Sequence, residues 1–388
     1  MPIPRTRLPR ALPSRRTLLL GALLLAGAPL SATAHAQASP YAQAGAHPRY
    51  GAAIDSARAI AMQLVAERRL PGLSVAVGID GEIIWSEGFG FADVENRVPV
   101  TPLTRFRIAS ISKPVTAAAI GLLVEQGRLD LDAPVQRYVP TFPQKPWPVT
   151  TRLLAGHLAG IRHYNGGEFL SAIAYPSVTA ALAVFADDTL LHQPGTRYAY
   201  SSYGWNLISA VIEGAAQESF LRYMRDNVFT PLGMRRTVAE HPDSIIPFRA
   251  RFYQRGRDGV LVNAPYVDNS VKWAGGGFLS TAEDLVRFGS AHLEPGFLKA
   301  ETLALMHTSQ KSSDGRETGY GIGWSVGRDS TGRRTIGHSG GAVGGNTYLL
   351  LLPDQRIVVA LLANTSNAGT NARVAGRIAR QFISAADR

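Results

Sequence analysis

Ser110 and Lys113 are the residues of this sequence best placed for covalent chemistry. They stand three apart in the run Arg107 to Lys113, which reads Arg-Ile-Ala-Ser-Ile-Ser-Lys. Residues three apart on a helix share a face, so the lysine amine can reach the serine hydroxyl. A serine needs such a base to become a nucleophile, and burial in an apolar helix lowers the pKa of a lysine and frees its neutral amine. The pair predicts a Ser110 nucleophile with Lys113 beside it.

A bare Ser-x-x-Lys is a weak signal, and three later segments strengthen it. Tyr200 and Ser202 lie in a Tyr-Ser-Ser run that follows Gln-Pro-Gly-Thr at 193–196. A triglycine stands at 275–277 in Trp-Ala-Gly-Gly-Gly-Phe-Leu-Ser-Thr, and His-Ser-Gly-Gly stands at 338–341. A tyrosine in an aromatic-rich segment usually only packs in the core, so Tyr200 is a candidate for catalysis only because the other segments occur with it in this order.

In this order the segments resemble the serine β-lactamase-like family, which includes class C β-lactamases, D-Ala-D-Ala peptidases and related esterases. The Ser-x-x-Lys tetrad is a known signature of β-lactamases and penicillin-binding proteins. The resemblance covers roughly Pro71 to Asn364, and the segments 107–113, 129–135 and 157–164 are similar to mitochondrial members of the family.

The resemblance implies a role for each matching residue. Tyr200 would be a proton relay facing Ser110 and the leaving group, and either a tyrosinate at Tyr200 or the Lys113 amine could be the general base. The N–H groups of Ser110 and Gly341 would form an oxyanion hole. Around them, the implied substrate-binding residues are Ser202, His338, Ser339 and Gly340.

Two of these positions depart from the common family pattern. Ser202 stands where asparagine is usual, and a hydroxyl has a shorter reach than an amide and only one donor. His338 stands where the lysine of Lys-Thr-Gly is usual, and histidine is mostly neutral near pH 7. A fixed positive charge is therefore missing there, which predicts weaker capture of substrates that carry a carboxylate, such as penicillins or peptidoglycan termini.

Other chemistries fit the sequence less well. Gly337 to Gly341 also matches the Gly-x-Ser-x-Gly nucleophile elbow, but that elbow requires a following helix and a later histidine, and no histidine follows His338. His157 and His163 are too far apart for a helical metal-binding pair and are expected to be structural. The triglycine lacks the lysine and Ser/Thr of a phosphate-binding loop and resembles a wall of the family's active-site cleft. We expect neither a metal nor another cofactor.

The elements needed to position these groups follow from local patterns. The stretch from Ser110 to Gly127 predicts a deeply buried helix, and Pro114 is tolerable only in its first turn. Further helices are expected at 54–69 and 371–384, and strands at 73–77, 82–85, 320–326, 335–338, 347–352 and 357–362. An Asp-Gly at 80–81 predicts a hairpin. These patterns predict an α/β sandwich, with an antiparallel sheet built from both ends of the chain, helices on its faces and a helical insertion at about 130–307.

The composition of the chain and its first residues indicate where the protein acts and which partners it lacks. Residues 1–36 read as a secretory signal, with arginines, an apolar stretch and Ala-His-Ala, and the twin arginines at 15–16 leave the twin-arginine route open. Residues 37–50 look like a flexible leader and 51–388 like one domain. The apolar stretch is short for a membrane span, so no stable span is expected after signal removal. The net charge of +11 comes partly from that segment and forms no basic patch, so no nucleic-acid partner is expected. Cys is absent, which excludes thiol nucleophiles and disulfides.

The sequence therefore predicts an exported serine hydrolase, periplasmic or secreted, that acts on amide or ester bonds through a Ser110 acyl-enzyme. A peptidase-like activity on peptides is the first hypothesis. An esterase or weak β-lactamase remains open, as does a non-catalytic binding or self-assembling protein with a vestigial pocket. The sequence leaves the oligomeric state open.

Overall fold

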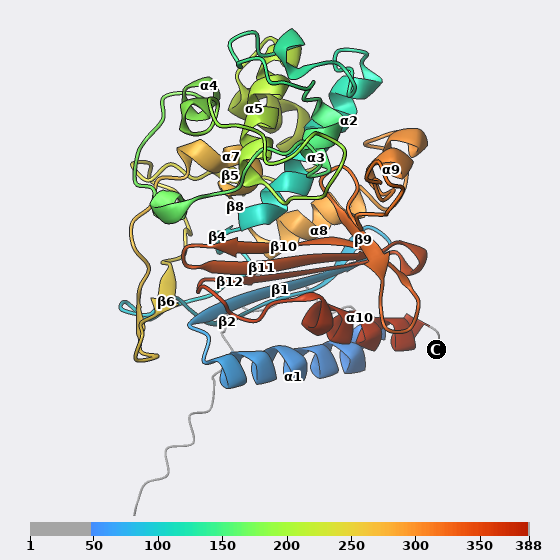
Figure 1. The fold of residues 1–388 in the computed structure, drawn as a ribbon. Coiled ribbons are helices and arrows are strands. Elements are labelled where there is room, and N and C mark those ends of the chain that lie inside the picture. Colours follow the sequence, from blue (N-terminus) through green and yellow to red (C-terminus); the bar gives the residue numbers. More distant parts are fainter. Residues whose placement is uncertain (1–47, 387–388) are drawn as a thin grey trace, which may run out of the picture. The chain divides into compact units, whose positions relative to one another are not determined.

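A seven-stranded antiparallel sheet forms the centre of the computed structural model, which describes residues 48–386. The strand order is β3-β2-β1-β12-β11-β10-β9, so strands from the two ends of the chain lie side by side (Figure 1). The strands run β1 Gly72–Ile79, β2 Glu82–Asp93, β3 Val98–Pro99, β9 Ser325–Arg328, β10 Arg334–Ala342, β11 Gly345–Leu352 and β12 Ile357–Ala363. The predicted sheet from both chain ends is confirmed.

Local chemistry accounts for the order of the central strands. Asp80 and Gly81 have φ of 51° and 84°, as the turn between β1 and β2 requires. Every residue of β1 and β12 is buried, and both strands are nearly all apolar. Such strands are stable only when both faces are covered, which places them at the middle of the sheet. Their antiparallel pairing runs from Leu73↔Ala363 to Ile79↔Ile357.

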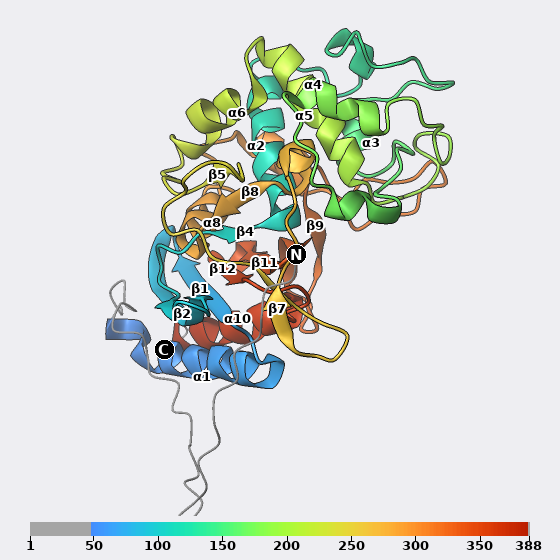
Figure 2. The same ribbon diagram turned by 90° about the vertical axis from the view of Figure 1, so that its left-hand side faces the viewer.

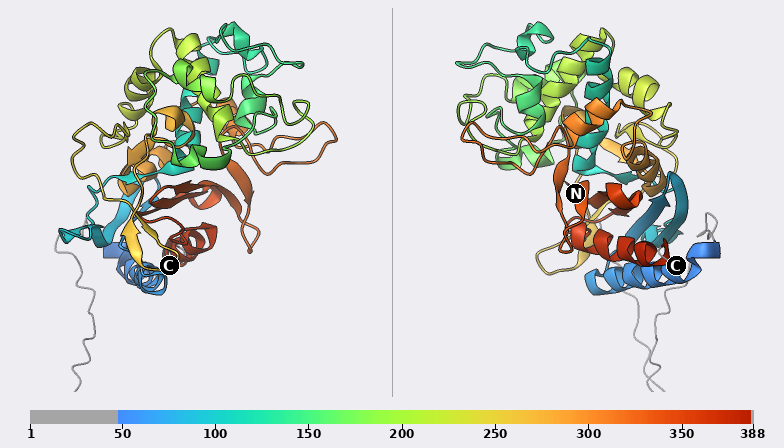
Figure 3. Two further views of the ribbon diagram at one scale, coloured as in Figure 1. Left: turned by 60° about the vertical axis from the view of Figure 1, so that its left-hand side comes forward. Right: turned by 90° about the vertical axis from the view of Figure 1, so that its right-hand side faces the viewer.

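Helices cover both faces of this sheet. The first and last helices, α1 Gly51–Arg68 and α10 Ala372–Ala386, pack side by side on one face (Figures 1 and 3). Small residues, Ala57 and Ala61 on α1 and Ala375 and Ala379 on α10, are fully buried there and allow close approach. On the opposite face α8 Ala282–Ser290 packs on β1 and β12. Thr281 caps α8 by accepting from the Asp284 N–H.

A helical region stands over that second face, with the long helices α2 Ser112–Glu125 and α5 Ser202–Ala216 at its centre (Figure 2). Its shorter helices are α3 Thr151–Ala155, α4 Val178–Ala181, α6 Phe220–Tyr223, α7 Trp273–Gly276 and α9 Ala300–Met306. Two small sheets accompany it, one of β4 Phe106–Arg107, β8 Phe278–Ser280 and β5 Val238–Ala239, the other of β6 Tyr253–Arg255 and β7 Leu261–Asn263. Most of these elements fall within residues 130–307, but α8 in the same range belongs to the sheet layer.

The structure corrects two local expectations. The strand expected at 320–326 begins only at Ser325, because Tyr320 turns inward and bonds to His338. The leader expected at 37–50 ends in a 3-10 turn at Pro48–Tyr50 that leads into α1, and its other residues lie outside the described part of the chain. The signal expected at 1–36 also lies outside it. Within residues 48–386, no helix combines the length and apolar character needed to cross a membrane.

Candidate active site

Ser110 sits in a tight turn at the entrance to α2. The turn, Ala109–Ile111, is a 3-10 helix that continues directly into α2, so Pro114 falls in the first turn of the helix as expected. Ala109 has a φ of 51°, a left-handed conformation that costs an alanine about 1 kcal/mol. The Ile108 N–H donates to the Phe278 carbonyl (3.1 Å) and its carbonyl accepts from Thr347 Oγ1 (3.0 Å). Contacts from β8 and β11 thus hold the strained turn in place.

The Lys113 amine points at the Ser110 hydroxyl. Its Nζ lies 3.0 Å from Ser110 Oγ, 3.1 Å from Ser202 Oγ and 2.6 Å from the Gly275 carbonyl. The whole side chain is buried, and none of the described carboxylates forms an ion pair with it. The predicted pair is therefore brought together, and Ser202 and the triglycine segment complete the surroundings of the amine.

Burial drives the pKa values of the lysine and the tyrosine in opposite directions. Desolvation lowers the pKa of Lys113 well below its ordinary 10.5, because a buried ammonium loses its hydration. Desolvation raises the pKa of Tyr200, although hydrogen bonds with Ser110 and Ser202 oppose the rise. The Lys113 Nζ lies 4.9 Å from the Tyr200 ring centroid. The site therefore favours a neutral amine beside a protonated phenol.

Two histidines accept hydrogen bonds from the backbone of the Tyr-Ser-Ser segment. The Ser201 N–H donates to His157 Nδ1 (3.0 Å), and the Ser202 N–H donates to His163 Nδ1 (3.1 Å). The His157 ring also lies against the Tyr200 ring, with centroids 4.2 Å apart. Only a neutral imidazole can accept these bonds. Burial secures that form, since it lowers the pKa of His163 to about 4 and that of His157 well below 6.5. Both histidines therefore act structurally, as expected, by fixing the backbone that carries Tyr200 and Ser202.

The segment 338–341 on β10 divides into residues that face the pocket and residues that do not. The partner strand β9 pairs with β10 only as far as Gly337↔Ser325, which leaves the rest of that edge open, and Gly341 lines the pocket beside Ser110. A Cβ on Gly340 would lie 2.5 Å from the Ile108 carbonyl oxygen, so this glycine lets β10 approach the nucleophile turn. Gly341 is thus placed as expected, whereas Gly340 contacts the turn rather than the pocket.

His338 and Ser339 also lie outside the pocket lining. The buried His338 ring turns into the protein, where Nε2 lies 2.7 Å from the Tyr320 hydroxyl and Nδ1 2.6 Å from the Ser339 carbonyl. Burial lowers the pKa of His338 to about 3, so the side chain is neutral. This corrects the expectation that His338 faces the substrate, and it agrees with the missing charge at this position. Ser339 is exposed, and its contact with substrate stays a prediction. No helix follows it, because β10 turns at Val343-Gly344 into β11, which contradicts the nucleophile-elbow alternative.

The pocket around Ser110 contains residues that sequence reasoning missed. Its empty space is about 410 Å³, part of it open to solvent, and it is lined by Ser110, His163, Tyr164, Phe169, Tyr200, Ser202, Asn269, Lys272, Gly276 and Gly341 to Val343. Only two residues separate Lys272 from the triglycine in a chain that has few lysines, and this was the one signal that could have found it. Residues 48–386 contain no cluster of carboxylates and histidines able to hold a metal.

Comparison with known proteins adds three likenesses. The family model described as Beta-lactamase matches residues 57–382. The human "Serine beta-lactamase-like protein LACTB, mitochondrial" is 34% identical, and the match covers 86% of this chain and 80% of that protein. Penicillin-binding protein 4* of Bacillus subtilis is 28% identical over 73% of this chain and 66% of its own length.

Among solved structures, the octameric penicillin-binding protein homologue of Pyrococcus abyssi superimposes with a TM-score of 0.74 at 29% identity, covering 85% of this chain and 77% of that chain. The resemblance drawn from the motifs, including the likeness to mitochondrial members, is confirmed.

Proposed function

The chain belongs to the β-lactamase family, and from that premise we propose that it is a serine hydrolase that forms an acyl-enzyme on Ser110 with amide or ester substrates. One observation carries the proposal. A fully buried Lys113 amine without a carboxylate partner among the described residues lies 3.0 Å from Ser110 Oγ, and Ser110 lines a pocket together with Tyr200 and Gly341.

In the proposed acylation, the neutral Lys113 amine takes the proton of Ser110 Oγ while Oγ attacks the substrate carbonyl carbon. The N–H groups of Ser110 and Gly341 stabilise the negative charge on the carbonyl oxygen. When the tetrahedral intermediate collapses, the bond to the leaving group breaks and the Tyr200 hydroxyl protonates the departing atom. The ammonium of Lys113 then returns its proton to Tyr200.

Deacylation runs the same groups in reverse. A water molecule gives its proton to the Tyr200–Lys113 pair and attacks the acyl ester, and Ser110 Oγ leaves with a proton from Lys113. The pKa directions support this division of labour, because the group with the lowered pKa can accept a proton and the phenol with the raised pKa can donate one. Lys113 is therefore proposed as the base, which the sequence left open.

Within this mechanism we propose peptidase-like substrates before β-lactams. The neutral, inward-turned His338 supports a weak interaction with a penicillin carboxylate on the β10 side of the site. The names of the Bacillus and Pyrococcus proteins point to penicillin binding in those relatives, which makes a penicillin a necessary probe. An esterase of the same fold is the alternative within the class.

The test is covalent labelling. Mature protein is incubated with a fluorophosphonate and with a fluorescent penicillin, and intact mass is measured for wild type, Ser110→Ala and Ser339→Ala. We expect the phosphonate adduct on wild type and on S339A, whose serine belongs to the rival motif, but not on S110A. An adduct on S110A contradicts the assignment, and no adduct on any form favours a binding protein. Panels of D- and L-peptides and short-chain esters then separate peptidase from esterase.

Export is proposed from the first 36 residues alone, because their arginines, apolar stretch and Ala-His-Ala form a secretory pattern. The check is the intact mass or N-terminal sequence of the protein recovered from outside the cytoplasm. A chain that starts near Gln37 is the expected result, and a recovered chain that keeps Met1 contradicts it.

A further inference from the structure

Lys272 is a buried cation on the wall of the Ser110 pocket. It ends the 3-10 turn Ser270–Lys272 that leads into α7, and 4% of its surface is exposed. Its Nζ donates to the Phe169 carbonyl at 2.8 Å and lies 5.5 Å and 5.0 Å from the ring centroids of Tyr164 and Phe169. All three residues line the pocket, so the ammonium is held between aromatic walls next to the nucleophile.

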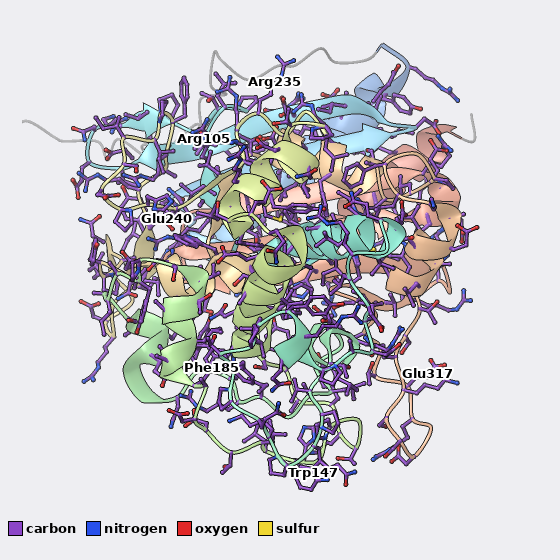
Figure 4. All side chains as sticks on the ribbon, turned by 90° about the horizontal axis from the view of Figure 1, so that it is seen from above. Arg105, Trp147, Phe185, Arg235, Glu240 and Glu317 are labelled. Atoms are coloured by element: carbon purple, nitrogen blue, oxygen red, sulfur yellow. The ribbon has the colours of Figure 1, made fainter. Side chains whose placement is uncertain are left out.

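This ammonium has no carboxylate partner. A buried lysine is normally paired, yet no acidic oxygen of residues 48–386 lies within salt-bridge distance of Lys272. The nearest acids are otherwise engaged. Glu240, labelled in Figure 4, accepts from Arg107 at 2.7 and 2.9 Å and from Asn269 Nδ2 at 2.5 Å. Asp268 accepts from the Ser270 N–H at 2.8 Å.

These acids nevertheless help to keep the lysine charged. The pKa of Lys272 is lowered from 10.5 to about 8, mainly by burial; Arg107 also lowers it, and Glu240 and Asp268 act against both. The side chain is therefore mostly an ammonium at pH 7. An ammonium has three donors, and the Phe169 carbonyl takes one of them. The described residues thus supply a charged group in the pocket that has donors to spare.

Two other basic side chains near Ser110, Lys113 and His338, cannot serve in the same way. The Lys113 nitrogen already lies within hydrogen-bond distance of Ser110 Oγ, Ser202 Oγ and the Gly275 carbonyl, and burial lowers its pKa well below 10.5, which favours the uncharged amine. On β10, His338 is neutral and bonded to Tyr320. Of these three side chains, only Lys272 lines the pocket and combines a retained charge with unused donors.

We propose that Lys272 binds a carboxylate of the substrate, so that the enzyme prefers acyl compounds that carry a negative charge close to the scissile bond. The proposal rests on the hydrolase function proposed above and names the substrate class of the same pocket. It also relocates the anion site. The lysine absent from β10 is replaced by one on the turn that precedes α7, and the hydrocarbon part of the substrate would lie against Tyr164 and Phe169.

Matched ester pairs test this directly. The first pair is the 4-nitrophenyl monoester of adipic acid and its methyl-capped neutral analogue, which place the charge on the acyl side. The second pair is 4-carboxyphenyl hexanoate and its methyl ester, which place it on the leaving group. For each pair the ratio of kcat/KM, charged over neutral, is measured for wild type, Lys272→Met and Lys145→Gln. Lys145 also donates to backbone carbonyls, those of Ala186 and Asp188, but lies outside the pocket lining, so it is the matched control.

For wild type we expect a ratio above one in one pair, and for K272M a fall in that ratio of on the order of tenfold to a hundredfold, as for hydrogen bonds to charged groups. K145Q should keep the wild-type ratio. The wild-type preference should also fade as the pH rises past about 8, where the ammonium loses its proton. If K272M also moves residue 169 and lowers kcat/KM for all substrates, both esters of a pair are affected equally. Their ratio therefore reports only the preference for charge.

The pair that responds identifies the side of the scissile bond on which the charge is bound. An unchanged ratio for K272M in both pairs overturns the proposal and leaves Lys272 as a group that pins the Phe169 segment. Phosphonate labelling of Ser110 in K272M separates this outcome from failure of the hydrolase function, because a labelled but non-selective enzyme refutes only the anion site.

Discussion

Gly340→Ala is expected to disable the nucleophile although residue 340 never touches it. A Cβ at this position would lie 2.1 Å from Thr347 Oγ1, 2.5 Å from the Ile108 carbonyl oxygen and 3.1 Å from Ala109 Cβ. Ordinary contacts are 3.4–4 Å, so β10 and the turn before Ser110 must separate by about 1 Å. The methyl group also breaks the Thr347 hydrogen bond to the Ile108 carbonyl.

The magnitude follows from these two effects. Overpacking of a filled site costs about 1–3 kcal/mol, and the lost hydrogen bond about 1 kcal/mol, so the free energy of unfolding should fall by about 2–4 kcal/mol. A displacement of about 1 Å at a reacting group can lower the rate about 100-fold. We therefore expect the rate of phosphonate labelling to fall by about that factor. The rate is measured well below the temperature at which the variant unfolds, so that the loss does not reflect unfolding.

The neighbouring glycine provides the control. A Cβ at Gly341 meets no atom within 4 Å, and its φ is not in the left-handed region, so Gly341→Ala should change the free energy of unfolding by less than about 0.5 kcal/mol. Urea unfolding and labelling rates are measured for both variants. If G340A labels within threefold of wild type and is as stable as G341A, then β10 does not position the nucleophile turn and the reasoning fails.

Three further predictions concern acid–base groups. The variants His157→Leu and His157→Asn place side chains of similar shape at this position, and the leucine variant should be less stable by about 2–4 kcal/mol in urea unfolding. Asparagine keeps an acceptor for the buried Ser201 N–H and tolerates the φ of 60° at residue 157; equal stabilities would contradict this. Lys113→Arg should abolish labelling, since a guanidinium stays charged, and for wild type kcat/KM on a neutral ester should rise with pH through the lowered pKa of Lys113; a labelled K113R or an opposite slope would exclude the amine as base. Stability should fall on acidification, because burial lowers the pKa of His292 to about 4 and of His307 and His338 to about 3. The unfolded chain then binds more protons below pH 6.5, which amounts to about 2 kcal/mol per histidine by pH 5 relative to pH 8; urea midpoints independent of pH would refute it.

Local patterns were sufficient to predict the sheet and the centre of the site. Asp80-Gly81 specifies a hairpin by its φ requirements alone, and the three-residue spacing of Ser110 and Lys113 fixes their common face. Such features depend on neighbours in sequence, which a reader of the sequence can see. The strand expected at 320–326 was wrong for the opposite reason, since the position of Tyr320 is decided by His338, a residue brought to it by the fold.

The remaining site features depend on partners that are distant in sequence. Nothing local marks Ala109 for a φ of 51°, and the conformation exists because β8 and β11 hold the turn on both sides. In the sequence Gly340 belongs to an expected substrate-binding motif. In the structure, a side chain at this position would collide with the carbonyl of Ile108, more than two hundred positions earlier. For Lys272 the sequence offers only its position just before the triglycine in a chain with few lysines; that its buried charge has no carboxylate partner depends on residues distant in sequence.

The choice between two bases shows most clearly what the fold adds to the sequence. In sequence terms Lys113 and Tyr200 are equivalent candidates, since either a tyrosinate favoured by a charged Lys113 or the neutral Lys113 amine could act as the base. The fold buries both, and burial penalises the charged form of each. For the lysine this yields the neutral amine, which is a base; for the tyrosine it yields the neutral phenol, which is an acid. A single physical cause therefore assigns opposite roles to two adjacent groups, and a bound substrate that excludes further water from the pocket would strengthen the assignment rather than reverse it.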